Sequence, residues 1–374
     1  MLRLGKILLF SIVLPAVVVV AIFVAGNRLV AAQGERDHLS DHFDGKTFHN
    51  IGAQDQRATP SVHRRHSFFG ALKWMLSRPK GDWMWHSDVL DAKPAERVYG
   101  SKLVATFVNH ATVLIQTEGL NILTDPVWSY RVGPVSFIGP RRYRAPDVRF
   151  EDLPPIDLVL ISHDHYDHMD LPTLKRLRRA WKPRIFVGLG NTQYLKDHGV
   201  GGAMDMDWWD STKVADSVAV MCVPAQHFSG RGLSDRNKTL WCGYVIETPH
   251  GNIYFAGDTG YGPFLEQIHT HFPNLRLACL PIGAYLPRWF MKPVHESPDE
   301  ALQAQRMLDA QTAISIHFGT FHMADDSMNA GPERIRALLD SLPVPKPDFR
   351  VLKNGQSTEV QSQLLPVSLN SGIK

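Results

Sequence analysis

The densest group of metal-binding residue types follows an apolar run at residues 156–161. In the stretch Ser–His–Asp–His–Tyr–Asp–His that comes next, the ligand candidates are His163, His165, Asp167 and His168. Imidazole and carboxylate groups bind zinc, iron and manganese, and an HxHxDH pattern supplies enough of them for two ions side by side. The alternative is a polar loop that carries histidines by coincidence, and this order of residues directly after a predicted strand disfavours it. The segment predicts a metal site.

The remaining ligands of a metal pair should lie at the ends of later strands. Three apolar runs further along the chain each end in a suitable residue, namely His227, Asp258 and His317. Taken singly, each is more often a capping or otherwise satisfied polar residue. As an ordered set they favour one site, because each strand would carry its polar residue to the same edge.

A metal pair of this kind is suited to hydrolysis. Two cations about 3.5–4 Å apart can share a water and lower its pKa toward about 7, which gives a bridging hydroxide at neutral pH. The same ions can neutralise charge that develops on a carbonyl or phosphoryl oxygen. Phosphodiesters, lactones, thioesters and β-lactams are all candidate substrates, and the ligands alone do not choose among them.

Strands and helices alternate from residue 103 onward, as expected for an α/β domain. Strands are predicted at 103–108, 112–116 and 121–126, and a hairpin is predicted from 241–248 and 252–256. The predicted helices are Leu171–Ala180, Pro263–His271, Pro298–Asp309 and Pro332–Ser341. Ligands at the ends of such strands suit a four-layer αβ/βα sandwich.

The N-terminus carries a candidate membrane segment. Residues 7–25 are apolar apart from Ser11, and Arg3 and Lys6 precede them. A helix of this length spans about 30 Å, the thickness of a hydrocarbon core. We predict an uncleaved N-terminal transmembrane helix, with cleavage near residues 30–32 as the alternative. The basic residues before it predict a periplasmic or other extracytoplasmic catalytic domain.

Three regions follow from this reading of the chain. Residues 1–26 are predicted as a membrane anchor or signal segment, 27–100 as a linker and amphipathic extension, and 101–365 as the hydrolase domain. Within the extension, 33–60 has no periodicity and predicts a linker. Residues 61–77 mix basic and aromatic side chains, so this helix would lie on an anionic lipid surface or pack on the domain.

Charge and cysteine content narrow the function classes further. A formal net charge of +3 is too small to argue for a nucleic-acid partner. Cys222, Cys242 and Cys279 form no CxxC spacing and lie in apolar runs, which predicts buried free thiols. A Cys222–Cys242 disulfide is the alternative outside the cytoplasm.

The ordered ligand set resembles that of the metallo-β-lactamase superfamily. The resemblance implies a metallo-β-lactamase sandwich with two zinc ions, or iron or manganese in their place. One metal would be held by His163, His165 and His227, and the other by Asp167, His168 and His317. Asp258 would bridge them, and Asp167 and Asp258 would also be catalytic.

A narrower resemblance is to the N-acyl-phosphatidylethanolamine-hydrolysing phospholipase D family. It rests on five segments: His110–Ile115, Leu123–Trp128, Ile138–Arg144, Phe255–Tyr261 and Pro281–Met291. It implies a zinc-dependent phosphodiesterase that uses the bridging hydroxide to release phosphatidic acid and N-acylethanolamine from membrane phospholipids. Phe318, where tryptophan is expected, and the loop after His227 depart from the family pattern and leave the acyl or head-group preference open.

The same resemblance suggests auxiliary residues around the metals. His295 would be a catalytic residue that contacts phosphate or supports the ligands, with Arg288 as a second auxiliary. His110 would orient a ligand carboxylate or contact substrate, unless it is a buried structural histidine. Further candidates for substrate binding are Tyr285, Arg141 and Arg142, and a solvated basic turn is the alternative for the two arginines.

Three other functions compete with the phospholipase. A metallo-hydrolase of a soluble ester, such as a sugar-phosphate lactone, would use the same ligands but would not need an anchor. A nuclease is disfavoured because the short interval between Asp258 and His317 leaves no room for a large nucleic-acid-binding domain. A non-catalytic binding protein is disfavoured because the ligand set is complete. The sequence leaves the oligomeric state open.

Overall fold

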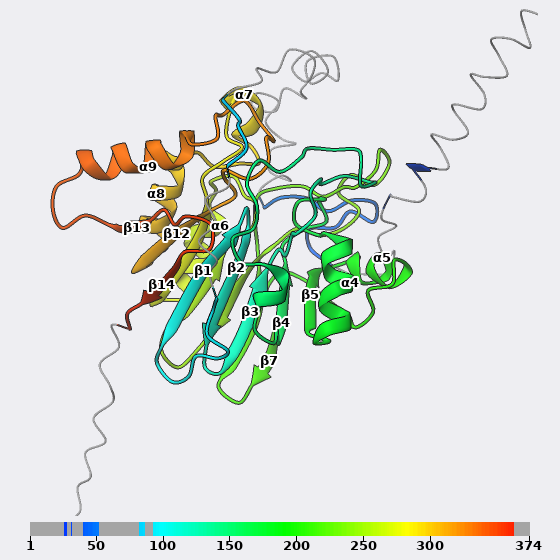
Figure 1. The fold of residues 1–374 in the computed structure, drawn as a ribbon, viewed down its shortest axis with the longest axis horizontal. Coiled ribbons are helices and arrows are strands. Elements are labelled where there is room, and N and C mark those ends of the chain that lie inside the picture. Colours follow the sequence, from blue (N-terminus) through cyan, green and yellow to red (C-terminus); the bar gives the residue numbers. More distant parts are fainter. Residues whose placement is uncertain (1–25, 28–30, 32–39, 52–81, 87–92, 363–374) are drawn as a thin grey trace, which may run out of the picture.

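The computed structural model describes residues 26–27, 31, 40–51, 82–86 and 93–362 of the 374-residue chain. Two seven-stranded sheets pack against each other, and helices lie outside them (Figure 1). The predicted membrane segment at 7–25 and the amphipathic segment at 61–77 fall outside the described residues. Among the residues that are described, none of the helices has the length and apolar character needed to cross a bilayer.

The first sheet has the strand order β14-β1-β2-β3-β4-β5-β6. Its strands are β1 (Leu103–Asn109), β2 (Thr112–Thr117), β3 (Leu120–Thr124), β4 (Leu158–Ile161), β5 (Arg184–Gly188), β6 (Ala203–Met206) and β14 (Ser357–Val360). Glu118 and Gly119 join β2 to β3 with positive φ at both residues, the geometry of a tight antiparallel hairpin turn. From β3 to β6 the pairing is parallel. The short 3-10 helix η1 (Phe150–Asp152) precedes β4, and α4 (Leu171–Ala180) and α5 (Asn191–Asp197) follow β4 and β5.

The second sheet has the order β13-β12-β11-β10-β9-β8-β7. Its strands are β7 (Ser211–Ala215), β8 (Val218–Val223), β9 (Gly243–Glu247), β10 (Asn252–Phe255), β11 (Leu275–Pro281), β12 (Thr312–Ile316) and β13 (Asp348–Arg350). The helices of this half are α6 (Phe264–His271), α7 (Arg288–Met291), α8 (Pro298–Met307) and α9 (Ala330–Ser341). A capping box fixes the beginning of α8, where Ser297 and Glu300 each bond the other's backbone N–H.

Two apolar clusters hold these layers together. The larger one lies between the sheets and joins side chains such as Phe107 and Ile122 to Tyr244 and Leu277. The smaller one lies between the first sheet and its helices, where Leu174 of α4 packs with side chains of β4 and β5. Because β4 is covered on both faces, all four of its residues are buried and its sequence is continuously apolar. The predicted mixed α/β fold is confirmed in the form of two packed sheets with outer helices.

Most predicted elements from 103 onward are confirmed. The helix at 171–180 has the predicted bounds, and the hairpin of β9 and β10 pairs as expected. All three cysteines are buried and free. The prediction of a linker at 33–60 is wrong for the described part, 40–51. Phe48 is buried in the main core, and its N–H donates to the Asn237 carbonyl at 2.8 Å, so this segment belongs to the domain.

Candidate metal centre

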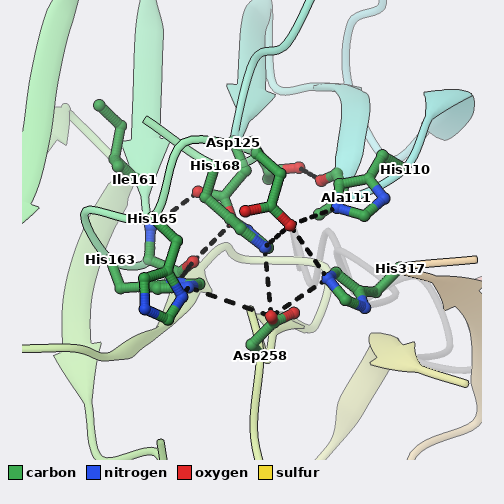
Figure 2. A network of polar contacts seen from close by, with 12 residues as sticks. His110, Ala111, Asp125, Ile161, His163, His165, His168, Asp258 and His317 are labelled. Atoms are coloured by element: carbon green, nitrogen blue, oxygen red, sulfur yellow. Dashed lines mark hydrogen bonds and ion pairs between the residues drawn. The ribbon is translucent and has the colours of Figure 1, made fainter. Parts of the chain in front are cut away.

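The structure brings all seven predicted ligands together at one edge of the two sheets. They lie in the segment after β4, and in the positions that follow β8, β10 and β12. Figure 2 shows side chains from the segments after β4, β10 and β12 pointing toward a common centre. The seven residues are His163, His165, Asp167, His168, His227, Asp258 and His317. Six of them are buried, and His165 is partly exposed.

Three imidazoles form the first cluster. His163 Nε2 lies 2.8 Å from His165 Nδ1, and His165 Nδ1 lies 3.4 Å from His227 Nε2. These nitrogens are close enough to bind one ion between them. The grouping matches the predicted first ligand set.

The second cluster combines one carboxylate with two imidazoles. Asp167 Oδ2 lies 3.4 Å from His168 Nε2 and 3.5 Å from His317 Nε2. The predicted second ligand set thus lies together, and His110 approaches closely enough to belong to the same group.

Asp258 lies between the two clusters. Its Oδ2 is 4.0 Å from His163 Nε2 and 3.8 Å from His227 Nε2, which belong to the first cluster. The same oxygen is 3.2 Å from His168 Nε2 and 3.1 Å from His317 Nε2, which belong to the second. A bridging ligand would need this position, and the bridging role remains a prediction.

A glycine turn delivers Asp258 to the centre. Gly257 has φ +61°, and a Cβ at this position would lie 2.4 Å from the Ser162 Cβ. Only glycine allows the chain after β10 to pass this close to the segment after β4. The turn thereby brings the Asp258 carboxylate beside the HxHxDH ligands.

Asp125, directly after β3, holds two histidines of the HxHxDH segment, His168 directly and His163 through Ser162. Its Oδ2 lies 2.6 Å from His168 Nδ1 and accepts a hydrogen bond from Ser162 Oγ at 2.6 Å. Ser162 Oγ is in turn 2.9 Å from His163 Nδ1. Since Nδ1 of each ring is engaged on the far side, Nε2 is the nitrogen that faces the centre.

Our sequence analysis missed this role of Asp125. The residue stood in the segment Leu123–Trp128, which we used only for the family resemblance. The available signal was a lone aspartate after an apolar strand, the same pattern that identified Asp258.

His110 and His227 have partners of the same kind. His110 Nε2 lies 2.9 Å from Asp167 Oδ2, which is the contact expected of a residue that orients this carboxylate, and the orienting role remains a prediction. The His110 ring is buried in a T-shaped contact with Phe321, and its contact with substrate remains a prediction. His227 Nδ1 donates to the Val294 carbonyl at 2.9 Å, which leaves its Nε2 toward the centre.

Burial keeps the imidazoles of the first cluster neutral. It lowers the pKa of His163 and His227 well below the ordinary value, because an imidazolium loses its hydration there. The neutral imidazole is the form that binds metals. These rings are therefore available as ligands at neutral pH.

The two carboxylates of the centre, Asp167 and Asp258, carry negative charge. Burial raises the pKa of Asp167 and Asp258, but adjacent His168 and several hydrogen bonds outweigh it and hold both pKa values well below the ordinary range. Burial lowers the pKa of His317, but the Asp258 carboxylate outweighs it and raises that pKa to about 9. Two buried carboxylates thus require positive charge beside them, which protons or metal ions can supply.

Unsatisfied polar atoms are a second observation that fits a metal pair. Several buried polar atoms at the centre lack a hydrogen bond of good geometry. His168 Nε2 and His317 Nε2 have only the carboxylate oxygens of Asp167 and Asp258 at 3.1–3.5 Å, and Asp258 Oδ1 and His295 Nδ1 are also unsatisfied. Buried polar atoms in proteins are ordinarily hydrogen-bonded, so several unsatisfied ones in one place indicate that the site binds a further group. Cations at the centre would provide it.

The structure places two of the predicted auxiliary residues beside the centre. His295 is buried, and its Nδ1 lies 4.0 Å from Asp258 Oδ2. Arg288 donates from Nη1 to the His295 carbonyl at 2.8 Å and pairs through Nη2 with Glu300 Oε2 at 2.5 Å. Its guanidinium is therefore engaged in holding His295, and a contact of Arg288 with substrate phosphate remains a prediction.

The other three residues predicted to bind substrate have different surroundings. Arg142 is buried and donates to the carbonyls of Ser129 and Val127, so the prediction that it is a solvated or substrate-binding arginine is wrong. Arg141 is exposed. Tyr285 is half-buried, and within the described part of the chain its hydroxyl makes no hydrogen bond to the seven residues. Substrate contact remains a prediction for Arg141 and Tyr285.

Comparison with known proteins agrees with this geometry. Residues 120–318 match the family described as Beta-lactamase superfamily domain. Over 253 residues, covering 64% of this chain and 71% of the relative, the chain is 40% identical to N-acyl-phosphatidylethanolamine-hydrolyzing phospholipase D 1 of Caenorhabditis elegans. A mitochondrial phospholipase D of the same name from Saccharomyces cerevisiae is 34% identical over 230 residues, 60% of this chain and 49% of the relative.

The fold also occurs among solved structures. A metallo hydrolase from the archaeon Ignicoccus hospitalis, Igni18, superposes with a TM-score of 0.52 over 70% of this chain and 99% of its own, at 20% identity. This likeness concerns the fold alone. The family match and the sequence relatives establish that the chain belongs to the metallo-β-lactamase superfamily, with N-acyl-phosphatidylethanolamine-hydrolysing phospholipases D among its homologues.

Proposed function

We propose that the protein is a zinc-dependent phosphodiesterase of the phospholipase D type. It would hydrolyse N-acyl-phosphatidylethanolamine-like phospholipids to phosphatidic acid and an N-acylethanolamine. The observation that carries the proposal is a complete seven-residue centre in a chain 40% identical to the phospholipase of Caenorhabditis elegans. That identity is high enough for the reaction class to be the first hypothesis to test.

Two zinc ions are proposed at the centre, with iron or manganese as the alternatives. His163, His165 and His227 would hold one ion, and Asp167, His168 and His317 the other, with Asp258 shared between them. When bound, such a pair supplies an activated water and neutralises charge on phosphoryl oxygens.

The surrounding residues would keep this ligand set in place. Asp125 and His110 hold His168 and Asp167 by hydrogen bonds of 2.6 and 2.9 Å. His295, buried beside Asp258, is proposed to contact the phosphate of the substrate. Burial of these groups removes competing water and strengthens their electrostatic interactions.

The remaining proposals concern location and architecture. The domain would be a four-layer αβ/βα sandwich tethered by an N-terminal transmembrane helix, with its centre on the periplasmic or extracytoplasmic side. Such a tether would keep the centre close to a phospholipid substrate. Phospholipid and membrane are accordingly the proposed partners, and no nucleic acid is proposed.

A comparison of two substrates tests the proposed reaction. The full chain should release N-acylethanolamine from a long-chain N-acyl phospholipid with a kcat/KM at least about tenfold above that for soluble bis-p-nitrophenyl phosphate. The reason is that binding energy from the acyl chains can be used in the transition state. The measurement is the rate of product release from substrate in mixed micelles, with the product quantified by mass spectrometry. The reverse order of preference would favour a hydrolase of soluble esters or lactones.

A further inference from the structure

A closed hairpin runs from Tyr130 to Arg142 between β3 and the 3-10 helix η1. The Val132 N–H donates to the Pro140 carbonyl at 3.0 Å, and the Arg142 N–H donates to the Tyr130 carbonyl at 2.9 Å. At its neck, Gly139 has φ +101°, and a Cβ there would lie 2.0 Å from the Val132 carbonyl oxygen. The closed neck makes residues 134–138 a defined projecting tip.

The tip is apolar and exposed. Phe137 is 74% exposed, Ile138 is 50% exposed and Val135 is 42% exposed. Trp85 is exposed as well and lies near the base of the hairpin, because the His86 N–H next to it donates to the Tyr143 carbonyl. Exposed apolar side chains that gather in this way indicate an interaction site.

A basic pocket lies at the base of the same hairpin. It has a volume of about 410 Å³ and is lined by Arg131, Gly139, Pro140, Arg141, Tyr143 and His322. The two arginines face each other across an antiparallel bridge. Among the described residues, neither guanidinium forms an ion pair with a carboxylate. The planar donors of arginine match the oxygens of a phosphate group.

We propose that this hairpin docks on an anionic phospholipid surface. A lipid phosphate would occupy the pocket between Arg131 and Arg141, and the tip at Val135, Phe137 and Ile138 would enter the interface between head groups and acyl chains. Basic residues beside exposed aromatic and aliphatic side chains are the combination that binds anionic membranes. The charge of the pocket therefore selects a lipid surface over a neutral apolar partner.

The docking surface is connected to the metal centre by two side-chain contacts. The guanidinium of Arg142, in the same hairpin, lies 5.3 Å from the Phe321 ring centroid. Phe321 lies 5.1 Å from the ring of His110, which bonds Asp167. The inference rests on the proposed function in this respect, because docking here would hold the centre next to the lipid that it hydrolyses.

A fluorescent label at the tip tests the proposal in the full chain. Ser136→Cys places one exposed thiol there, whereas the three native cysteines are buried, so a polarity-sensitive fluorophore would attach selectively. The protein is reconstituted in vesicles of phosphatidylcholine with or without phosphatidylglycerol, each also prepared with brominated lipid as a quencher. We expect a blue shift and quenching that depend on phosphatidylglycerol. Because the label reports only its own surroundings, the N-terminal segment does not supply the signal.

Charge variants make the test specific to the pocket. Arg131→Gln with Arg141→Gln should shift the docking equilibrium roughly 30-fold toward the undocked state, since each basic residue near an anionic surface contributes about fivefold. Arg141→Lys in the otherwise native chain should retain most of the effect of lipid charge. The matched control is Arg179→Gln, an exposed arginine on α4. Unchanged melting temperatures would show that the variants fold.

The outcomes separate docking from catalysis. A label that is unquenched in both lipids overturns the proposal, as does quenching that is independent of phosphatidylglycerol or of Arg131 and Arg141. Shielding of the label without lipid would indicate a protein partner and would also overturn it. Docking without hydrolysis of the N-acyl phospholipid would contradict only the proposed function, and hydrolysis without docking would contradict only this inference.

Discussion

Asp258→Asn is expected to abolish lipid hydrolysis and to reduce the metal content of the protein. The Asp258 Oδ2 atom lies within 4.0 Å of Nε2 in four histidines from both clusters. An amide keeps the shape of the side chain but removes the negative charge that two cations would share. The loss should exceed the about 10–100-fold that follows removal of a supporting residue. Elemental analysis and product release measure the two effects.

The control for this variant is a partly buried aspartate outside the centre. Asp205 accepts hydrogen bonds from the Asn191 and Thr192 N–H groups at the beginning of α5, at 3.2 and 3.0 Å. Asp205→Asn should leave metal content and turnover close to wild type, because it touches none of the seven residues. If Asp258→Asn also retained metal and activity, Asp258 would not be a shared ligand.

Asp125→Asn is expected to weaken metal binding about 10–100-fold, although Asp125 is not among the predicted ligands. An amide in place of the carboxylate would direct an N–H group toward His168 Nδ1, which now lies 2.6 Å from Asp125 Oδ2. The histidine would then favour the tautomer that is protonated on Nε2, and that nitrogen could no longer bind metal. Competition with a chromophoric chelator measures the affinity.

The backbone conformation at Asp125 should not be disturbed by this substitution. Its φ of +32° is a conformation that asparagine also tolerates well. Asp157→Asn is the matched control, since Asp157 precedes the other end of β4 and pairs with Arg97 at 2.5 Å. We expect the control to lower the free energy of unfolding without changing metal affinity. If both variants lost metal affinity equally, Asp125 would affect metal binding only through the stability of the fold.

The ligands could be predicted because their signal is local. His163, His165 and His168 are fixed by spacing within one segment, and His227, Asp258 and His317 each end an apolar run. Strand ends that share a sheet edge bring such residues together, whichever way the intervening chain runs. The helix at 171–180 was predictable for the same reason, since its apolar positions and proline lie within one stretch.

The supporting residues depend on contacts that the sequence does not display. Asp125 reaches His168 because β3 lies parallel to β4, and the order of strands is a property of the whole sheet. Arg142 is buried because Phe321, distant in sequence, pairs with it and covers it. The segment at 40–51 lacks periodicity, yet Asn50 exchanges two 3.0 Å hydrogen bonds with the backbone of His227.

The most direct test of the central claim is the number of metal ions that the seven residues hold. Purified full-length protein, loaded with zinc and freed of excess metal, should contain close to two ions per chain by elemental analysis. His168→Ala should remove one of them preferentially, and the chromophoric chelator should report two binding steps in the wild type. A wild-type protein that retains one ion or none under these conditions would contradict the metal pair and, with it, the proposed hydrolytic centre.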